Sequence, residues 1–273
     1  MKTKAIGMLL GTVLVLAAGA AAAFQVSPEL RQSIQADLEA IEKEGPKMGE
    51  VMAALREVGA SYLPELVANA DPDAVQSMAR RRMMTGVYLM DLTYAATFDR
   101  QPEAARFGQA LYALLDLVGY PEPDLERRYR EALAQIDEPG GDERLRQLVN
   151  EQNKSPAWQD RLDTGMGVEL VADSLYGFMI EGLYLTSELC ILSNYDPATM
   201  MYVAYLRNSF KAYEKLLYRL GDSPEFATAV DQHERLGFLA TILVILGDGP
   251  TVAPAQLDAL RPAIAKARKE IVP

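Results

Sequence analysis

The segment from Arg80 to Phe98 constrains the fold of this chain more than any other feature. After its basic start it is apolar or small on almost every side of a helix, with a single carboxylate, Asp91, inside it. A helix that is apolar all round cannot face water and has to be wrapped by other helices. The segment therefore predicts an all-α protein, a multi-helix bundle around central apolar helices.

Helix start and stop signals divide the rest of the chain, and strand signals are scarce. Ser27-Pro28, for example, pairs a capping side chain with a proline at the first helical turn, and Gly45-Pro46 ends that helix. We expect helices at about 28–44, 47–58, 62–68, 73–98, 103–118, 124–136, 142–154, 157–192, 198–220, 224–246 and 254–271. The pattern predicts about ten helices in one domain over residues 24–273. The apolar run 236–246 is too short to cross a bilayer, so we expect a centrally buried helix there.

The first 23 residues have the three parts of a secretory signal peptide. Lys2 and Lys4 form a basic start, an apolar run follows, and alanines precede Phe24. The alternative is an uncleaved anchor helix, since the apolar run is almost long enough to span a bilayer. The alanine-rich end favours cleavage. We therefore expect a periplasmic or secreted protein without stable membrane insertion after cleavage.

Composition excludes several classes of partner and cofactor. Loss of Lys2 and Lys4 takes the formal net charge from −11 to −13, which disfavours nucleic acid and anionic membrane surfaces. One cysteine, Cys190, rules out a disulfide within the chain, and its apolar neighbours favour a buried thiol. The single histidine, His233, lies in a charged turn, and no motif for a metal, haem or nucleotide is present. We expect no cofactor and no metal.

A weak internal repeat pairs the two most apolar segments. Asp91 aligns with Glu181 at an offset of 90, and Tyr94 then aligns with Tyr184. The helices that follow end alike, because residues 114–119 match residues 216–221 at an offset of 102. This predicts two pseudo-repeated halves, about 24–139 and 140–273, with their apolar helices meeting in the middle.

The segment Tyr88-Leu89-Met90-Asp91-Leu92-Thr93-Tyr94-Ala95 resembles a motif of uncharacterised all-helical proteins of the bacterial envelope. Many of those proteins are lipoproteins, whereas this chain has no cysteine near its signal cleavage site. The motif covers about a tenth of the chain and carries no known activity. The resemblance implies a fold and not a function.

The paired acids and their neighbours form the candidate ligand-binding site. We expect its residues to be Tyr88, Met90, Asp91, Tyr94, Tyr176, Met179, Glu181 and Tyr184. A buried carboxylate is costly unless it is hydrogen-bonded or protonated. One interpretation is a cavity in which both acids meet a ligand. The other is structural, with each acid satisfied by a tyrosine hydroxyl, by Arg81 or Arg82, or by a helix end.

Three functional hypotheses follow from these residues. The first is a non-enzymatic periplasmic protein that binds an apolar or amphipathic, lipid-like small molecule between its halves. The second is a structural or adaptor protein of the cell envelope, with a protein partner and no small-molecule site. The third is an enzyme that uses the Asp91 and Glu181 carboxylates, for example in sugar hydrolysis.

Overall fold

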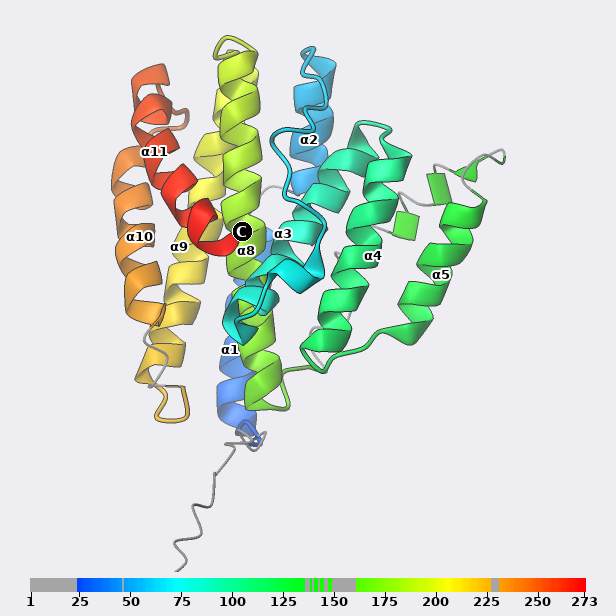
Figure 1. Cartoon of the computed structure of the whole chain (residues 1–273). Helices are drawn as coiled ribbons and strands as arrows, with labels where there is room; N and C mark the ends of the chain where they lie inside the picture. Colours follow the sequence, from blue (N-terminus) through cyan, green and yellow to red (C-terminus); the bar gives the residue numbers. More distant parts are fainter. Residues whose placement is uncertain are drawn as a thin grey trace, which may run out of the picture.

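The structure is a computed structural model that describes residues 24–45, 47–135, 161–226 and 231–273, with a few positions between 138 and 148. Within these residues the chain is all-α, as predicted, and its only strand-like pairing is an isolated bridge between Gln25 and Thr164. The elements are α1 (Pro28–Glu44), α2 (Met48–Glu57), η1 (Pro72–Ala74), α3 (Met78–Thr97), α4 (Gln101–Leu117), α5 (Pro123–Ala134), α8 (Gly165–Leu192), α9 (Pro197–Asp222), α10 (Asp231–Leu246) and α11 (Pro254–Ile271) (Figure 1). The segment 1–23, expected to be a signal peptide, and most of the helix expected at 142–154 lie outside the described residues. The count of about ten helices therefore stays a prediction.

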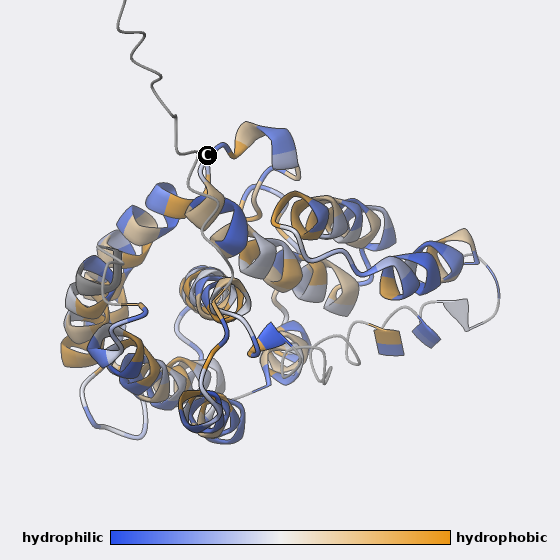
Figure 2. Ribbon diagram, turned by 90° about the horizontal axis from the view of Figure 1, so that it is seen from below, coloured by the Kyte–Doolittle hydropathy of each residue, from blue (hydrophilic) through white to orange (hydrophobic). Residues whose placement is uncertain are grey.

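Helices α3 and α8 form the centre of the described bundle and make its most extensive helix–helix contact. They run in the same direction, because Arg82 contacts Asp173 near one end and Asp91 contacts Glu181 further along. Figure 2 looks along the bundle, with a central helix seen nearly end-on and other helices beside it. Figure 1 shows α9, α10 and α11 on one side of α8 and α4 and α5 on the other.

Glycines let the backbones of α3 and α8 touch. A Cβ atom added at Gly86 would lie 1.7 Å from the carbonyl oxygen of Ser174. A Cβ atom added at Gly177 would lie 1.9 Å from the carbonyl oxygen of Met83. No side chain fits at either position without moving a backbone, so these two glycines set the distance and the register of the helix pair.

Helix α8 is apolar because it is central. By length and composition alone it could cross a membrane, and it is the one such helix among the residues that the structure describes. However, 72% of its most apolar window is buried by the rest of the protein. Its neighbours are α3, α9, α11 and α2. Burial on all sides within a folded domain accounts for this composition.

Residues 61–69 do not form the short helix expected at 62–68, and that prediction was wrong. After Gly59, which has a φ of 94° and follows α2, the chain runs in irregular backbone with one turn at 64–66. In Figure 1 the connection between α2 and α3 crosses the face of the central helices. Apart from turn bonds such as that from the Leu66 N–H to Leu63 O (3.1 Å), its backbone groups bond to side chains of α3 and α11.

Two further expectations about helices are corrected. Helix α3 begins at Met78, not near residue 73, because residues 72–74 form the short η1 and the Arg81 side chain bonds the carbonyl of Val75 at 2.7 Å. Helix α10, which contains the run 236–246, is peripheral. Its buried side faces α9 and α11, while Val244 on the other side is 81% exposed.

The structure leaves the internal repeat as a prediction. Helix α3 packs extensively on α4, which would be the first helical pair. In the second pair, α9 contacts α1 and α10 more extensively than it contacts α8. The two pairs are therefore not packed alike, although their central helices do meet.

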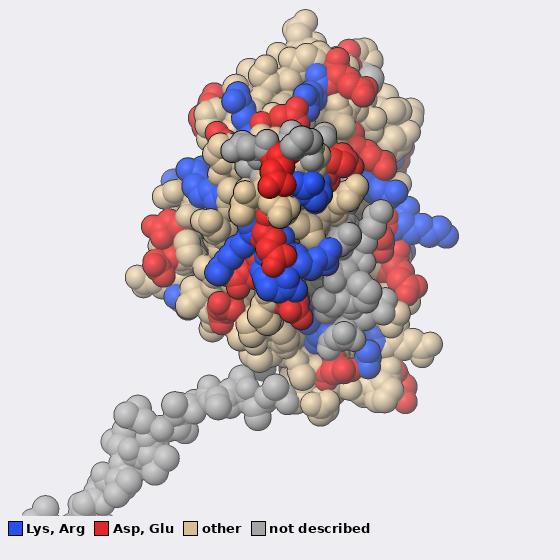
Figure 3. Space-filling view, turned by 90° about the vertical axis from the view of Figure 1, so that its right-hand side faces the viewer, with Lys and Arg blue, Asp and Glu red and all other residues tan. Residues whose placement is uncertain are grey.

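The outer surface near α5 carries mixed charge. Seen from the side of α4 and α5, basic and acidic side chains lie interspersed (Figure 3). On α5, Arg127 pairs with Glu131 at 2.9 Å and Arg130 pairs with Glu126. Such exposed pairs contribute little to stability, and they keep this face soluble.

Candidate functional site

Asp91 of α3 and Glu181 of α8 lie side by side at the centre of the bundle. Both residues are 0% exposed, and their carboxyl groups are in hydrogen-bonding contact. The parallel packing of α3 on α8 produces this meeting. Arg268 of α11 reaches the same point: its Nε lies 2.7 Å from Oε2 of Glu181 and its Nη2 lies 2.9 Å from Oε1. We call Asp91, Glu181 and Arg268 the central cluster.

The central cluster has one more acid than it has cations. Burial raises the pKa of Asp91 well above its ordinary value, and the Glu181 charge raises it further, against the opposing effects of the Ala68 N–H and Arg268. Burial also raises the pKa of Glu181, but the charge and the hydrogen bonds of Arg268 oppose that rise. Glu181 is therefore the ionised partner of Arg268, and Asp91 holds a proton more strongly than Glu181 does.

The polar side chains around the central cluster bind the backbone of residues 61–69. Five hydrogen bonds link this segment to α3 and α11. They run from Ala68 N–H to Asp91 Oδ2 (3.0 Å), from Leu63 N–H to the Tyr94 hydroxyl (2.9 Å), from that hydroxyl to Ser61 O (3.2 Å), from the Tyr88 hydroxyl to Asn69 O (2.9 Å) and from Arg268 Nη2 to Leu66 O (2.9 Å). The segment covers the acids, and the acids and tyrosines hold the segment in place.

The remaining residues of the expected site fall into two groups. Met90 and Tyr184 belong near the central cluster: Met90 lies beside Gly182, and the Arg268 guanidinium lies 4.3 Å from the centre of the Tyr184 ring. Tyr176 lies elsewhere on α8, 5.0 Å below the guanidinium of Arg235. Met179 is buried in the core. The structure thus brings together the acids with Tyr88, Tyr94, Tyr184 and Met90, and it separates Tyr176 from them.

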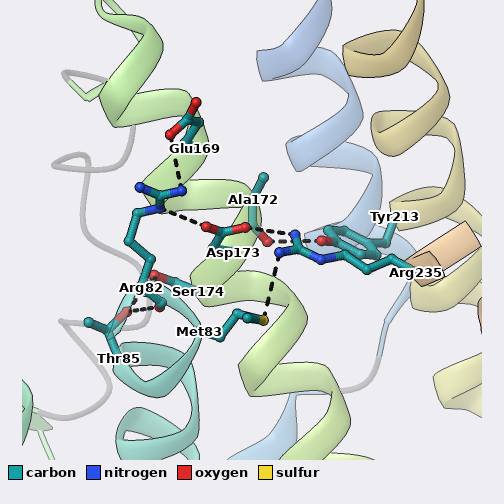
Figure 4. Close-up of polar contacts among 9 residues, drawn as sticks. All are labelled: Arg82, Met83, Thr85, Glu169, Ala172, Asp173, Ser174, Tyr213 and Arg235. Carbon is teal, nitrogen blue, oxygen red and sulfur yellow. Dashed lines mark hydrogen bonds and ion pairs between the residues drawn. The ribbon is translucent and has the colours of Figure 1, made fainter. Parts of the chain in front are cut away.

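A second polar cluster, which the sequence reasoning missed, joins α3, α8 and α10 (Figure 4). Asp173 accepts from Arg82 Nε at 2.6 Å through Oδ2 and pairs with Arg235 Nη1 at 2.7 Å through Oδ1. Arg82 also pairs with Glu169 at 3.0 Å. We call Arg82, Glu169, Asp173 and Arg235 the paired cluster, since it has two acids and two cations.

Two neighbouring hydroxyls hold the backbone at Arg82 of the paired cluster. The hydroxyls of Thr85 and Ser174 lie 2.5 Å apart, and each donates a hydrogen bond to the carbonyl oxygen of Arg82.

Arg82 was one expected partner for the acids at 91 and 181, but it pairs with Asp173 instead. The available signal was Asp173 itself, a further acid inside the apolar stretch that becomes α8.

This geometry differs from that of a glycosidase. Paired carboxyls that hydrolyse sugars stand about 5–9 Å apart in a cleft open to substrate and water. Here the two carboxyls touch and are 0% exposed. A substrate could reach them only if residues 61–69 moved away.

No family model, curated protein or solved structure matches this chain. The likeness of the segment around Asp91 to bacterial envelope proteins therefore rests on its motif alone. The function has to be argued from the contacts of the chain itself.

Proposed function

We propose that this chain is an exported, non-enzymatic helical protein of the cell envelope that acts through its surface, as a structural or adaptor protein. The supporting observation is that the polar side chains of the expected ligand site bind the chain itself. Asp91, Tyr88 and Tyr94 hold backbone groups of residues 61–69, and both oxygens of Glu181 accept from Arg268. Because buried polar groups normally have partners, these contacts explain the acids without a ligand.

The charge of the chain favours a protein partner over other macromolecules. Without Lys2 and Lys4 the formal net charge is −13, and the charged residues on the face in Figure 3 are of both signs. A surface of this kind is repelled by nucleic acid and by anionic lipid. It forms specific contacts most readily with a protein surface of complementary charge.

Export is the first part of this proposal to test. Fractionation of the native cells, followed by N-terminal sequencing of the protein, should find it in the periplasm or the medium with Phe24 as its first residue. Recovery in the membrane fraction with Met1 and the apolar segment intact would show an anchored protein instead.

The adaptor role needs a partner that binds in a purified system. Cross-linking in intact cells and affinity purification should recover one protein in constant proportion. That protein, purified alone, should then bind the mature chain with saturation at a fixed stoichiometry. If the native protein is free of protein partners after cross-linking, the adaptor role is wrong.

A second candidate is the binding of an apolar or amphipathic small molecule between the halves. It is favoured by two buried polar atoms, one in the 61–69 segment and one beneath it. Among the described residues, neither the Tyr62 hydroxyl nor Asp91 Oδ1 has a conventional hydrogen-bond partner. The ligand would have to displace the 61–69 segment. Native mass spectrometry of protein from its own cells should then show a bound mass that organic extraction releases, whereas an adaptor would show the mass of the mature chain alone.

A further inference from the structure

One oxygen of the central cluster lacks a conventional donor. Asp91 Oδ2 accepts the Ala68 N–H, but no N–H or hydroxyl of the described residues bonds Asp91 Oδ1. The neighbouring group is the Glu181 carboxyl, and both of its oxygens already accept from Arg268. Two ionised carboxylates in contact repel each other strongly away from water, whereas a single proton between them makes a hydrogen bond.

We propose that Asp91 is protonated in the folded chain and donates a hydrogen bond to Glu181, and that loss of this proton releases residues 61–69 from α3. The proton then acts as a latch on the segment that covers the centre of the bundle. Such a latch would operate in an adaptor and in a ligand-binding protein alike.

Among the described residues, Arg268 is the one cation whose charge acts on Asp91, so no further cation is there to replace the proton. Asp91 interacts electrostatically with the following charged or titratable groups: Glu181 of α8, Arg268 of α11, Tyr88 and Tyr94 of α3, and Tyr62 of the covering segment. The other two neighbouring helices present apolar groups here, Met48 from α2 beside Gly182 and Phe107 from α4 beside Tyr88. Burial raises the pKa of Tyr94 to about 12, so its hydroxyl stays neutral.

The covering segment is the part that can yield when Asp91 ionises. Separating α3 from α8 would cost much free energy. Gly86 and Gly177 pack the two backbones against each other, and Asp173 of α8 binds both Arg82 of α3 and Arg235 of α10. Residues 61–69 have no helix of their own, and five side-chain bonds attach them at this site. Their release gives the new carboxylate access to water, which removes most of its repulsion from Glu181.

The sign of the pH dependence follows from proton binding. In the closed state the pKa of Asp91 is raised, whereas with the segment released it returns toward the ordinary value of about 4. Between these two values, opening releases one proton. The equilibrium constant for opening should therefore rise about tenfold for each unit of pH across that interval.

Hydrogen exchange at the Ala68 and Leu63 amides tests the latch directly. Protection factors, which remove the intrinsic pH dependence of exchange, should fall about tenfold per pH unit in the wild-type protein. In Asp91→Asn they should be independent of pH, because the side-chain oxygen still accepts the Ala68 N–H and the amide N–H₂ replaces the acid proton. Glu188→Gln, which changes another α8 acid that has an arginine partner, should retain the wild-type slope. The proposal is overturned if the wild-type factors are flat or if Asp91→Asn keeps their slope.

A second measurement needs no variant. Infrared spectra of the wild-type protein with ¹³C-labelled aspartate should show, at neutral pH, the C=O stretch of one protonated aspartic acid. This band should disappear at the pH where Ala68 loses protection. If every aspartate is ionised at neutral pH while the amides of residues 61–69 remain protected, the segment is held without the proton and the latch does not exist.

Discussion

The central cluster and the paired cluster lie on the same two helices, yet they balance charge in different ways. In the paired cluster, Asp173 binds Arg82 and Arg235, and Glu169 supplies the second acid. In the central cluster, two acids share Arg268. The first cluster is neutral with every group ionised, whereas the second is neutral only if it holds one proton.

If the proposed latch exists, one helix pair supports a rigid end and an end that responds to pH. The paired cluster binds α10 to the centre through Arg235 and stands beside the backbone contact at Gly86 and Gly177. The central cluster binds two backbone groups of an irregular segment, and Tyr88 and Tyr94 bind three more. Changes at either cluster should therefore cost global stability, and changes at Asp91 in the second should also alter the response to pH.

The largest effect should come from the glycines between the clusters. Gly86→Ala and Gly177→Ala should each lower the free energy of unfolding by about 4–5 kcal/mol, because the added Cβ overlaps a backbone carbonyl. Urea denaturation followed by circular dichroism measures this. The double variant should cost much less than the sum, since both changes push apart the same contact.

Gly237→Ala in α10 is the matched control. A Cβ atom there meets nothing within 4 Å, so alanine should stabilise the helix by about 0.5–1 kcal/mol. Equal losses at all three positions would mean that the close approach of α3 to α8 is not what the glycines provide.

The next largest effect should come from Arg268→Met. It leaves Glu181 and Asp91 buried with no cation and removes the bond to Leu66 O, so we expect a loss of about 3–4 kcal/mol in the free energy of unfolding. Arg261→Met is the control. Arg261 makes the same two-bond contact with Glu188, which lies about two helical turns beyond Glu181 on α8. The Arg261 side chain is 55% exposed, whereas that of Arg268 is 15% exposed, so the loss for Arg261→Met should be clearly smaller. Similar losses for both would contradict a special role for the central cluster.

The sequence predicted that the two apolar helices meet, because their apolar periodicity is a local signal, and a shared site for Asp91 and Glu181 was one of two interpretations of it. It did not predict Arg268, which comes from a helix 87 residues away in the chain. The paired cluster was missed for the same reason. Nothing near Asp173 in the sequence indicates Arg82 or Arg235, and only the packing of α3 and α10 on α8 brings them together.

Two errors about local structure have a shared physical cause. Residues 61–69 have helix-compatible composition, yet buried side chains of α3 offer their backbone better partners than a short helix would. Helix α10 is apolar enough for a core, yet the chain places it at the edge of the bundle with Val244 exposed. In both cases tertiary contacts decided between states that composition left close in energy.

Asp173→Asn should cost about 2–3 kcal/mol of unfolding free energy at neutral pH. An asparagine is uncharged and has one acceptor oxygen for two arginines, so both Arg82 and Arg235 lose the carboxylate charge and one of them faces an N–H₂ group in place of an acceptor. Arg82 retains Glu169, which limits the loss. Thermal unfolding at fixed pH measures the difference. A neutral outcome would mean that the second arginine finds water or another acceptor.

The same substitution at Asp91 should have its smallest effect below about pH 4 and the most distinctive dependence on pH. Because the folded chain raises the pKa of Asp91 above the value of about 4 that it has when unfolded, the wild-type protein loses about 1.4 kcal/mol of unfolding free energy for each pH unit between those values. In Asp91→Asn the amide N–H₂ takes the place of the acid proton at every pH, so the variant does not lose this stability.

The measurement compares the two proteins at each pH. Subtracting the urea-unfolding free energy of the wild type from that of the variant at the same pH cancels the contributions of the other titrating groups. That difference should be flat below about pH 4 and should then rise in favour of the variant as pH increases. A falling difference at position 91 would mean that Asp91 is ionised in the folded chain and that Arg268 serves both acids.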